Sequence, residues 1–190
     1  GIKVKYSTFE SNEALFAKLK ILKKDGYDVA FPSTYFVERM RRLGMLKPLD
    51  HNKLPNMKNL NPDLLNKPYD PDNAYSIPYM WGSSAIGVNA KAVDPASITS
   101  WNDLWNPAYK GKVLLMDDVR DVFAMSLRSL GYSANDTNHE HLKEAYEKLL
   151  KLKPSVKVFN SDSPKQPYLN NEVVIGQIWG GEVYQANEEN

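Results

Sequence analysis

The sequence predicts an α/β protein in which helices cover mainly parallel β-sheets. Segments with strand periodicity alternate with segments of helical periodicity along the chain, as in strand–helix–strand units. The 190 residues are 42% hydrophobic and 25% charged, which is typical of folded globular proteins. The composition changes around residues 75–90, which indicates a boundary between two α/β units.

Two predicted strand–helix pairs occupy residues 1–44. Apolar and polar side chains alternate over 2–7, which predicts a half-buried strand. A helix is predicted over 11–24, where the first Ser or Asn can serve as the N-cap. The apolar segment 27–31 predicts a buried strand closed by a proline. A second helix is predicted over 33–44, with Ser or Thr as its cap and Gly at its end.

A long connector and another strand follow. Residues 47–74 are rich in Pro, Asn and Asp, yet leucines recur through them, which predicts an ordered connector. The proline at position 78 places segment 75–82 at a sheet edge or in a crossing segment. The apolar run 84–89 predicts the next strand.

Two capping boxes mark helix starts in the second half of the chain. Ser100 pairs with Asp103, and Thr137 pairs with Glu140, at the spacing that satisfies two backbone N–H groups reciprocally. A further helix is predicted over 119–130 and is ended by the glycine that follows. The remaining predicted strands are 113–116, 156–159 and 173–179.

Carboxylates gather where the strand 113–116 ends. Asp117 and Asp118 follow the strand directly, and Asp121 falls in the first turn of the next helix. Ligands of α/β proteins bind at the carboxyl ends of strands, so these acids suggest a ligand that is cationic or carries a metal. Helix stability explains the same pattern, because an N-cap and an acid in the first turn each contribute up to about 1 kcal/mol. The two interpretations are compatible.

Aromatic residues lie at the ends of two other predicted strands. Tyr35 follows the strand 27–31, and Trp179 closes the strand 173–179. A single aromatic residue at such a position is more often a packing residue. An aromatic face also contacts methylene groups and attracts an ammonium group. Together with the acids, these residues favour a site for an aliphatic amine.

Other classes of site have little support. The net charge of +1 gives no reason to expect a nucleic-acid partner, and the absence of cysteine excludes disulfides and cysteine metal sites. His139 and His141 would point to different sides of a helix, so we expect no metal site there. The sequence has no Ser-His-acid signature and no glycine-rich nucleotide-binding motif, so we expect no cofactor and no catalysis. A DDxxD string also occurs within helices of magnesium-dependent enzymes that act on diphosphates. Here it follows a strand, and such an enzyme is the alternative from a different class.

A series of short motifs runs along the chain. They are YSTFESNE (6–13), FPSTY (31–35), NKP (66–68), SIPYMWG (76–82), IGVN (86–89), WNDLW (101–105), KG (110–111), DDVR (117–120), FNSD (159–162) and IW (178–179). On these motifs the chain resembles the spermidine/putrescine-binding proteins of polyamine ABC importers over essentially its whole length.

The resemblance implies a two-lobed, periplasmic-binding-protein-like α/β fold with the ligand between the lobes. It divides the chain into a partial first lobe (1–83), a hinge crossing (84–89) and a partial second lobe (90–190). It further implies that the family's first strand precedes Gly1 and that the C-terminal third follows Asn190. The chain would then be a fragment, which we expect to bind ligand weakly or not at all by itself.

The resemblance also implies a polyamine site and its partners. The implied ligand-binding residues are Ser33, Tyr35, Asp118, Asp121, Ser161 and Trp179. The two acids would hold an ammonium end, the aromatic residues would contact the carbon chain, and the serines would add hydrogen bonds. The family pattern leads us to expect Glu at position 121, and Asp is one methylene shorter.

The implied function is non-catalytic capture of polyamine for a membrane permease of an ABC transporter. The location would be the periplasm or the extracellular face of the cell membrane, and the full-length parent would be a monomer. The alternative within the fold is a binder of another small cationic or metal-associated solute.

Overall fold

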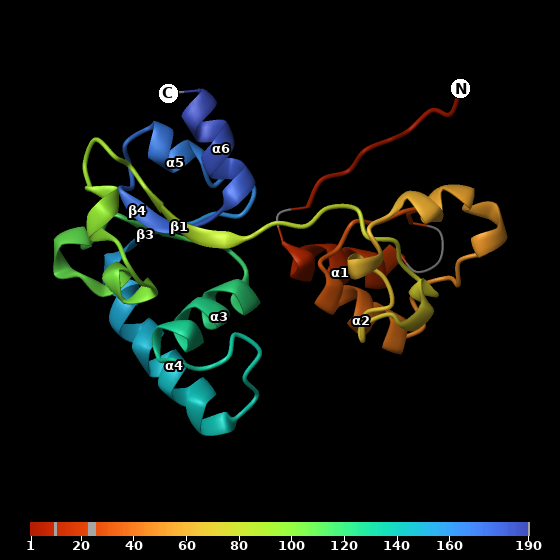
Figure 1. Cartoon of the computed structure of the whole chain (residues 1–190), viewed down its shortest axis with the longest axis horizontal. Helices are drawn as coiled ribbons and strands as arrows, with labels where there is room; N and C mark the ends of the chain where they lie inside the picture. Colours follow the sequence, from red (N-terminus) through yellow and green to blue (C-terminus); the bar gives the residue numbers. More distant parts are fainter. Residues whose placement is uncertain (10, 23–25, 190) are drawn as a thin grey trace. The chain divides into compact units, whose positions relative to one another are not determined.

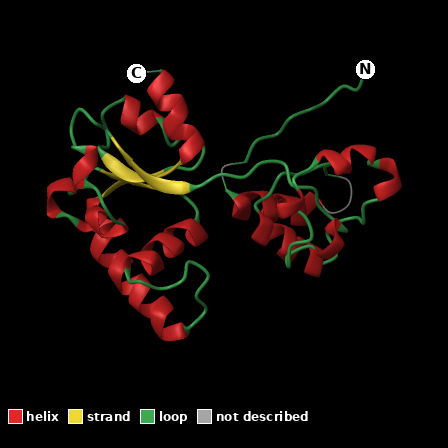
Figure 2. Cartoon of the chain, in the orientation of Figure 1, coloured by secondary structure: helices red, strands yellow, loops and turns green. Residues whose placement is uncertain are grey.

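The computed structural model describes residues 1–9, 11–22 and 26–189 (Figure 1). The chain divides into two compact units, residues 1–81 and residues 82–190. In the described part of the chain, all four named strands belong to the second unit (Figure 2). None of the described helices is long and apolar enough to cross a membrane.

Two helices form the core of the first unit. Helix α1 (Asn12–Leu22) packs on helix α2 (Thr34–Arg42) through the buried side chains of Phe16, Phe36 and Met40. The hydroxyl of Ser11 accepts a hydrogen bond from the backbone N–H of Ala14 at 3.2 Å, which confirms the predicted start of α1. The predicted end of this helix lies outside the described residues. Gly44, with φ of 64°, follows α2 as predicted.

The two strands predicted in the first unit were wrong. Residues 2–7 and 27–31 have no regular structure, and all of their large apolar side chains are exposed. Ile2 is 95% exposed and Val29 is 68% exposed. A strand needs a neighbour to satisfy its backbone N–H and C=O groups. No described segment of this unit pairs with either one, so alternation alone does not make a strand here.

The connector 47–74 is ordered, as predicted. It contains the short 3₁₀ helices η2 (His51–Lys53), η3 (Pro55–Asn59), η4 (Pro62–Leu64) and η5 (Pro71–Asn73). Asp70 is buried, and its carboxylate accepts hydrogen bonds from the backbone of Tyr75 at 3.1 Å and the hydroxyl of Ser76 at 2.7 Å. The side-chain oxygen of the buried Asn73 accepts a hydrogen bond from the backbone of residue 66 at 2.9 Å. Polar side chains therefore supply the hydrogen bonds that this segment lacks from helices and strands.

A four-stranded sheet forms the centre of the second unit, with the order β1-β4-β2-β3. The strands are β1 (Ser84–Val88), β2 (Val113–Leu115), β3 (Val156–Phe159) and β4 (Ile175–Trp179). Strand β2 pairs in parallel with β3 and β4, and β1 pairs antiparallel with β4. The four strands confirm the sequence prediction for this half of the chain, and the central strands form the expected parallel sheet.

Helices cover both faces of this sheet. The α-helices are α3 (Val119–Ser129), α4 (His139–Leu152), α5 (Gln166–Leu169) and α6 (Gly180–Glu188). The 3₁₀ helices are η6 (Pro95–Ser97), η7 (Trp101–Trp105), η8 (Pro107–Tyr109) and η9 (Lys153–Ser155). Figure 1 shows α3 and α4 on one side of the sheet and α5 and α6 on the other. The capping box of Ser100 with Asp103 is present at the start of η7.

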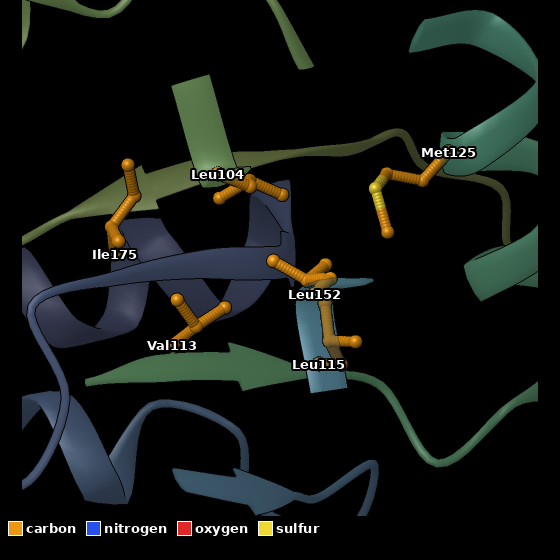
Figure 3. Close-up of a cluster of buried hydrophobic side chains, with 6 residues drawn as sticks. All are labelled: Leu104, Val113, Leu115, Met125, Leu152 and Ile175. Atoms are coloured by element: carbon orange, nitrogen blue, oxygen red, sulfur yellow. The ribbon is translucent and has the colours of Figure 1, made fainter. Parts of the chain in front are cut away.

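Strand β2 is buried on both faces because its side chains alternate between two apolar clusters. Val113 and Leu115 pack with Leu104, Met125, Leu152 and Ile175, as Figure 3 shows. Leu114 belongs to a second cluster with Met116 and Val173. The continuous apolar run therefore suits β2 as an interior strand that is buried on both faces, and the acids that follow it lie beyond its carboxyl end.

Helix α4 begins one residue later than the sequence predicted. The cap is Asn138 and not Thr137, because the Asn138 side chain accepts a hydrogen bond from the backbone N–H of Glu140 at 2.9 Å. The backbone N–H of Asn138 in turn donates to the carboxylate of Asp136 at 2.8 Å. This second bond places Asn138 at the cap position.

Replacing Asn138 with alanine is expected to destabilise the protein by about 1 kcal/mol, the usual cost of losing an N-cap. Replacing the exposed Thr137 with alanine is the matched control, and it should change stability by less than about 0.5 kcal/mol. Urea unfolding followed by circular dichroism would measure both. A larger effect at Thr137 than at Asn138 would restore the sequence-based assignment of the cap.

Candidate functional site

The start of α3 presents two of the predicted acids at the carboxyl end of β2. Asp118 is the N-cap of α3, and its Oδ1 accepts a hydrogen bond from the backbone N–H of Asp121 at 3.0 Å. Asp117 precedes the cap and is exposed. Asp118 and Asp121 are half-buried, and the cap fixes the orientation of Asp118 relative to the first helical turn. The helix-cap interpretation is therefore confirmed for Asp118.

The carboxylate of Asp121 joins three segments that are distant in the sequence. Its Oδ2 accepts hydrogen bonds from Nε1 of Trp179 and from the hydroxyl of Ser84, both at 3.3 Å. Trp179 ends β4 and Ser84 begins β1, and these two residues are partners in the antiparallel ladder. The structure thus brings Asp118, Asp121 and Trp179 together at the start of α3.

Sequence reasoning missed two residues that hold this arrangement. Ser84 has no local signal, because it meets Asp121 only through the antiparallel pairing of β1 with β4. Gln177 is 1% exposed, and its Nε2 donates to the backbone oxygen of Asp121 at 2.9 Å. A polar residue inside the apolar run 173–179 is the signal that could have identified Gln177, because buried polar groups need a specific partner.

The surroundings of Asp121 oppose its negative charge. Burial is the largest cause that raises the pKa of Asp121, and the neighbouring charge of Asp118 raises this pKa further. Hydrogen bonds from Trp179 and Ser84 and the charge of Arg120 lower the pKa of Asp121, but the net direction is upward. A half-buried carboxylate with a raised pKa gains from a cation placed next to it. This electrostatic state favours a cationic ligand at the start of α3.

Ser161 follows β3 and lies in a turn that Asn160 organises. Oδ1 of Asn160 accepts hydrogen bonds from the backbone N–H groups of Asp162 and Ser163, each at 3.0 Å. The hydroxyl oxygen of Ser161 is buried and has no hydrogen-bond partner among the described residues. It is therefore available as a hydrogen-bonding group, but no described contact joins it to Asp121.

The first unit holds the other two predicted residues, and Asn12 brings them together. Nδ2 of Asn12 donates to the hydroxyl of Ser33 at 3.0 Å and to the hydroxyl of Tyr35 at 3.4 Å. Ser33 occupies the cap position of α2 as predicted, but its side chain makes no capping hydrogen bond. The backbone N–H of Ser33 donates to Oδ1 of Asn12 at 2.9 Å, which ties the start of α2 to the start of α1. The sequence analysis considered Asn12 only as a helix cap.

The raised pKa of Asp121 predicts a pH dependence of stability. The pKa of Asp121 is higher in the folded protein than in the unfolded chain, where it is about 4. The group therefore adds to the stability of the fold fully at pH values below about 4. This contribution is lost as the pH rises through the folded pKa. Relative to the Asp121→Asn variant, the ligand-free protein should therefore lose melting temperature as the pH rises from about 4 to about 7. Calorimetric melting temperatures across this range would test the trend, and parallel curves for the two proteins would contradict it.

Known proteins resemble this chain over its whole length. The family described as bacterial extracellular solute-binding protein matches residues 1–190. The spermidine/putrescine-binding periplasmic protein of Escherichia coli K12 is 56% identical over 188 residues, which cover 99% of this chain and 54% of that protein. The putrescine-binding periplasmic protein PotF of Escherichia coli K12 is 38% identical over 200 residues, which cover 98% of this chain and 54% of that protein.

A solved structure shares the fold. A putative spermidine/putrescine ABC transporter protein from Listeria monocytogenes is 40% identical with a TM-score of 0.91, over 100% of this chain and 58% of that one. The chain therefore spans about half the length of the curated relatives that it matches.

Proposed function

The chain belongs to the family of bacterial extracellular solute-binding proteins, and on that premise we propose that the natural protein carrying residues 1–190 binds a polyamine. It captures the polyamine at the periplasmic or extracellular face of the cell membrane and passes it to the membrane permease of an ABC transporter. The names of the relatives, which include spermidine and putrescine, support this ligand class. The observation that carries the proposal is the half-buried carboxylate of Asp121, held beside Asp118 and the indole of Trp179.

The chemistry of the site suits a protonated amine. An ammonium group has three donors and no acceptor, and the two acids supply acceptor oxygens within one helical turn. Hydrogen bonds between charged partners are roughly twice as strong as neutral ones. The indole of Trp179, which is 37% exposed, offers an aromatic face to a cation or to methylene groups. The free-energy cost of removing the amine from water is offset, because the same contact stabilises the ionised form of Asp121.

Three further residues and the lobe boundaries belong to the same proposal. Ser161 would add a hydrogen bond through its hydroxyl, which has no partner among the described residues. Ser33 and Tyr35 of the first unit stay predicted ligand-binding residues, which would supply a hydroxyl group and an aromatic ring. The division into lobes at 1–83 and 90–190, with a crossing at 84–89, stays a prediction. Strand β1, which makes up most of that crossing, is part of the sheet of the second unit.

The alternative of a magnesium-dependent diphosphate enzyme requires the DDxxD string within a helix. In the structure the string spans a helix boundary, because α3 begins at Val119. Asp117 and Asp118 precede the helix, and only Asp121 lies inside it. The three carboxylates therefore do not form the helical face that such enzymes use to hold metal ions. This geometry favours the amine-binding proposal.

Titration calorimetry on the natural protein with spermidine and putrescine tests the proposed function. We expect micromolar or tighter binding of at least one polyamine, and a higher melting temperature with polyamine but not with magnesium diphosphate. Absence of polyamine binding would contradict the proposal. Residues 1–190 expressed alone are expected to bind weakly or not at all, and micromolar binding by this piece would contradict that second expectation.

A further inference from the structure

We propose that Ser84 is a positioning residue of the amine site. Together with Trp179 it holds Oδ2 of Asp121, so that the other carboxylate oxygen, Oδ1, is the one presented to an ammonium group. This inference rests on the proposed function, which it extends by assigning separate roles to the two oxygens of one carboxylate.

The backbone of Asp121 is fixed from both sides. Its N–H donates to Oδ1 of Asp118 at 3.0 Å, and its carbonyl oxygen accepts from Nε2 of Gln177 at 2.9 Å. Gln177 is almost completely buried in β4, so the first turn of α3 is held against the sheet. The main freedom left to Asp121 is therefore the orientation of its side chain.

Donors outside the helix must set that orientation. The last torsion of an Asp side chain has a broad energy minimum, so the residue alone does not select one direction for its oxygens. Ser84 and Trp179 both donate to Oδ2, and each bond is 3.3 Å long. A single bond of this length is weak, but two donors on one oxygen restrict the rotation of the carboxylate.

The two donors are held next to each other by the sheet. Ser84 and Trp179 are direct partners in the antiparallel ladder of β1 and β4. The backbone N–H of Gly180 also donates to the carbonyl oxygen of Ser83 at 2.9 Å, which continues the connection beyond the ladder. The hydroxyl and the indole N–H therefore reach Asp121 from paired positions on two neighbouring strands.

This arrangement leaves Oδ1 of Asp121 able to accept hydrogen bonds from a ligand. An ionised carboxylate has about four lone-pair sites, and the described residues supply hydrogen bonds only to Oδ2. Oδ1 can accept from an ammonium group without breaking a bond that holds the side chain. Without the Ser84 hydroxyl, the carboxylate is free to turn, and the amine must restrict it on binding.

The test compares Ser84→Ala with Ser84→Thr in the natural protein, with Ser83→Ala as the matched control. Ser83 is also exposed, and its hydrogen bond to Gly180 uses only its backbone. Calorimetry should show spermidine binding about fivefold to tenfold weaker in Ser84→Ala, near wild type in Ser84→Thr, and unchanged in Ser83→Ala. Equal affinity of Ser84→Ala and wild type would overturn the inference and leave the proposed function standing.

A second readout does not need ligand. NMR should show a higher pKa for the Asp121 carboxyl and a shifted Trp179 indole N–H resonance in Ser84→Ala, because the lost hydrogen bond lowers the pKa of Asp121 in the wild type. Ser84→Thr should restore both signals. If the wild-type protein binds no polyamine, the proposed function fails, and these signals still decide the role of Ser84. Unchanged signals in Ser84→Ala would overturn that role.

Discussion

Replacing Asp121 with asparagine is expected to weaken polyamine binding by about 100-fold, which corresponds to about 3 kcal/mol. The change keeps the size of the side chain but removes its charge. In the wild type the carboxylate is half-buried with a raised pKa, so an arriving ammonium group gains a charge-assisted bond and also relieves an existing electrostatic cost. Titration calorimetry with spermidine and putrescine measures the loss.

The matched control is Asp117→Asn. It removes the same charge from an exposed residue four positions earlier, which precedes the cap of α3. Binding should fall by less than about threefold, since exposed charges contribute little to a specific contact. A comparable loss in both variants would show that the net negative charge of this region attracts the amine, and that Asp121 has no specific contact with it.

Replacing Gly176 with alanine is expected to destabilise the second unit by about 3 kcal/mol or more. This is the upper end of the usual free-energy cost of adding a carbon atom to a well-packed core. A Cβ atom at this position would lie 2.1 Å from the backbone oxygen of Leu114 and 2.7 Å from its nitrogen. These are backbone atoms of the central strand β2, and Leu114 is the ladder partner of Gly176. The clash can be relieved only if β4 moves away from β2.

The control for this variant is Gly181→Ala. A Cβ atom at Gly181 would meet no atom within 4 Å, and the residue lies in α6. Alanine should therefore stabilise the helix by up to about 1 kcal/mol. Urea unfolding of both variants, followed by circular dichroism, would compare them. Wild-type stability in Gly176→Ala would contradict the close contact between β2 and β4.

The sequence motifs identified the family correctly. Motifs such as SIPYMWG and DDVR predicted a polyamine-transport relative, and a spermidine/putrescine-binding protein of Escherichia coli is 56% identical over 188 residues. This prediction succeeded because short motifs depend on residue identity and do not require any knowledge of long-range contacts.

The local structure of the second unit also followed from the sequence. The apolar run 113–116 was predicted to be a strand, and in the structure it lies inside the sheet, where both of its faces are buried. The glycine after α3 and the capping box before η7 act through neighbouring residues, so their effects could be read locally. At the start of α4 the predicted cap, Thr137, lies one residue before the observed cap, Asn138.

Only the tertiary structure decided which strands form and how the acid is held. Residues 2–7 and 27–31 have strand patterns, but a strand is stable only with a hydrogen-bonded neighbour, and pairing is not encoded in the segment itself. The sequence by itself determined that Asp121 lies in the first turn of the helix that follows a buried strand. The pairing of β1 with β4, which are about ninety residues apart, then placed Ser84 and Trp179 on one oxygen of that acid. Contacts of this range depend on the folded sheet, and they fix the direction in which the acid can receive a cation.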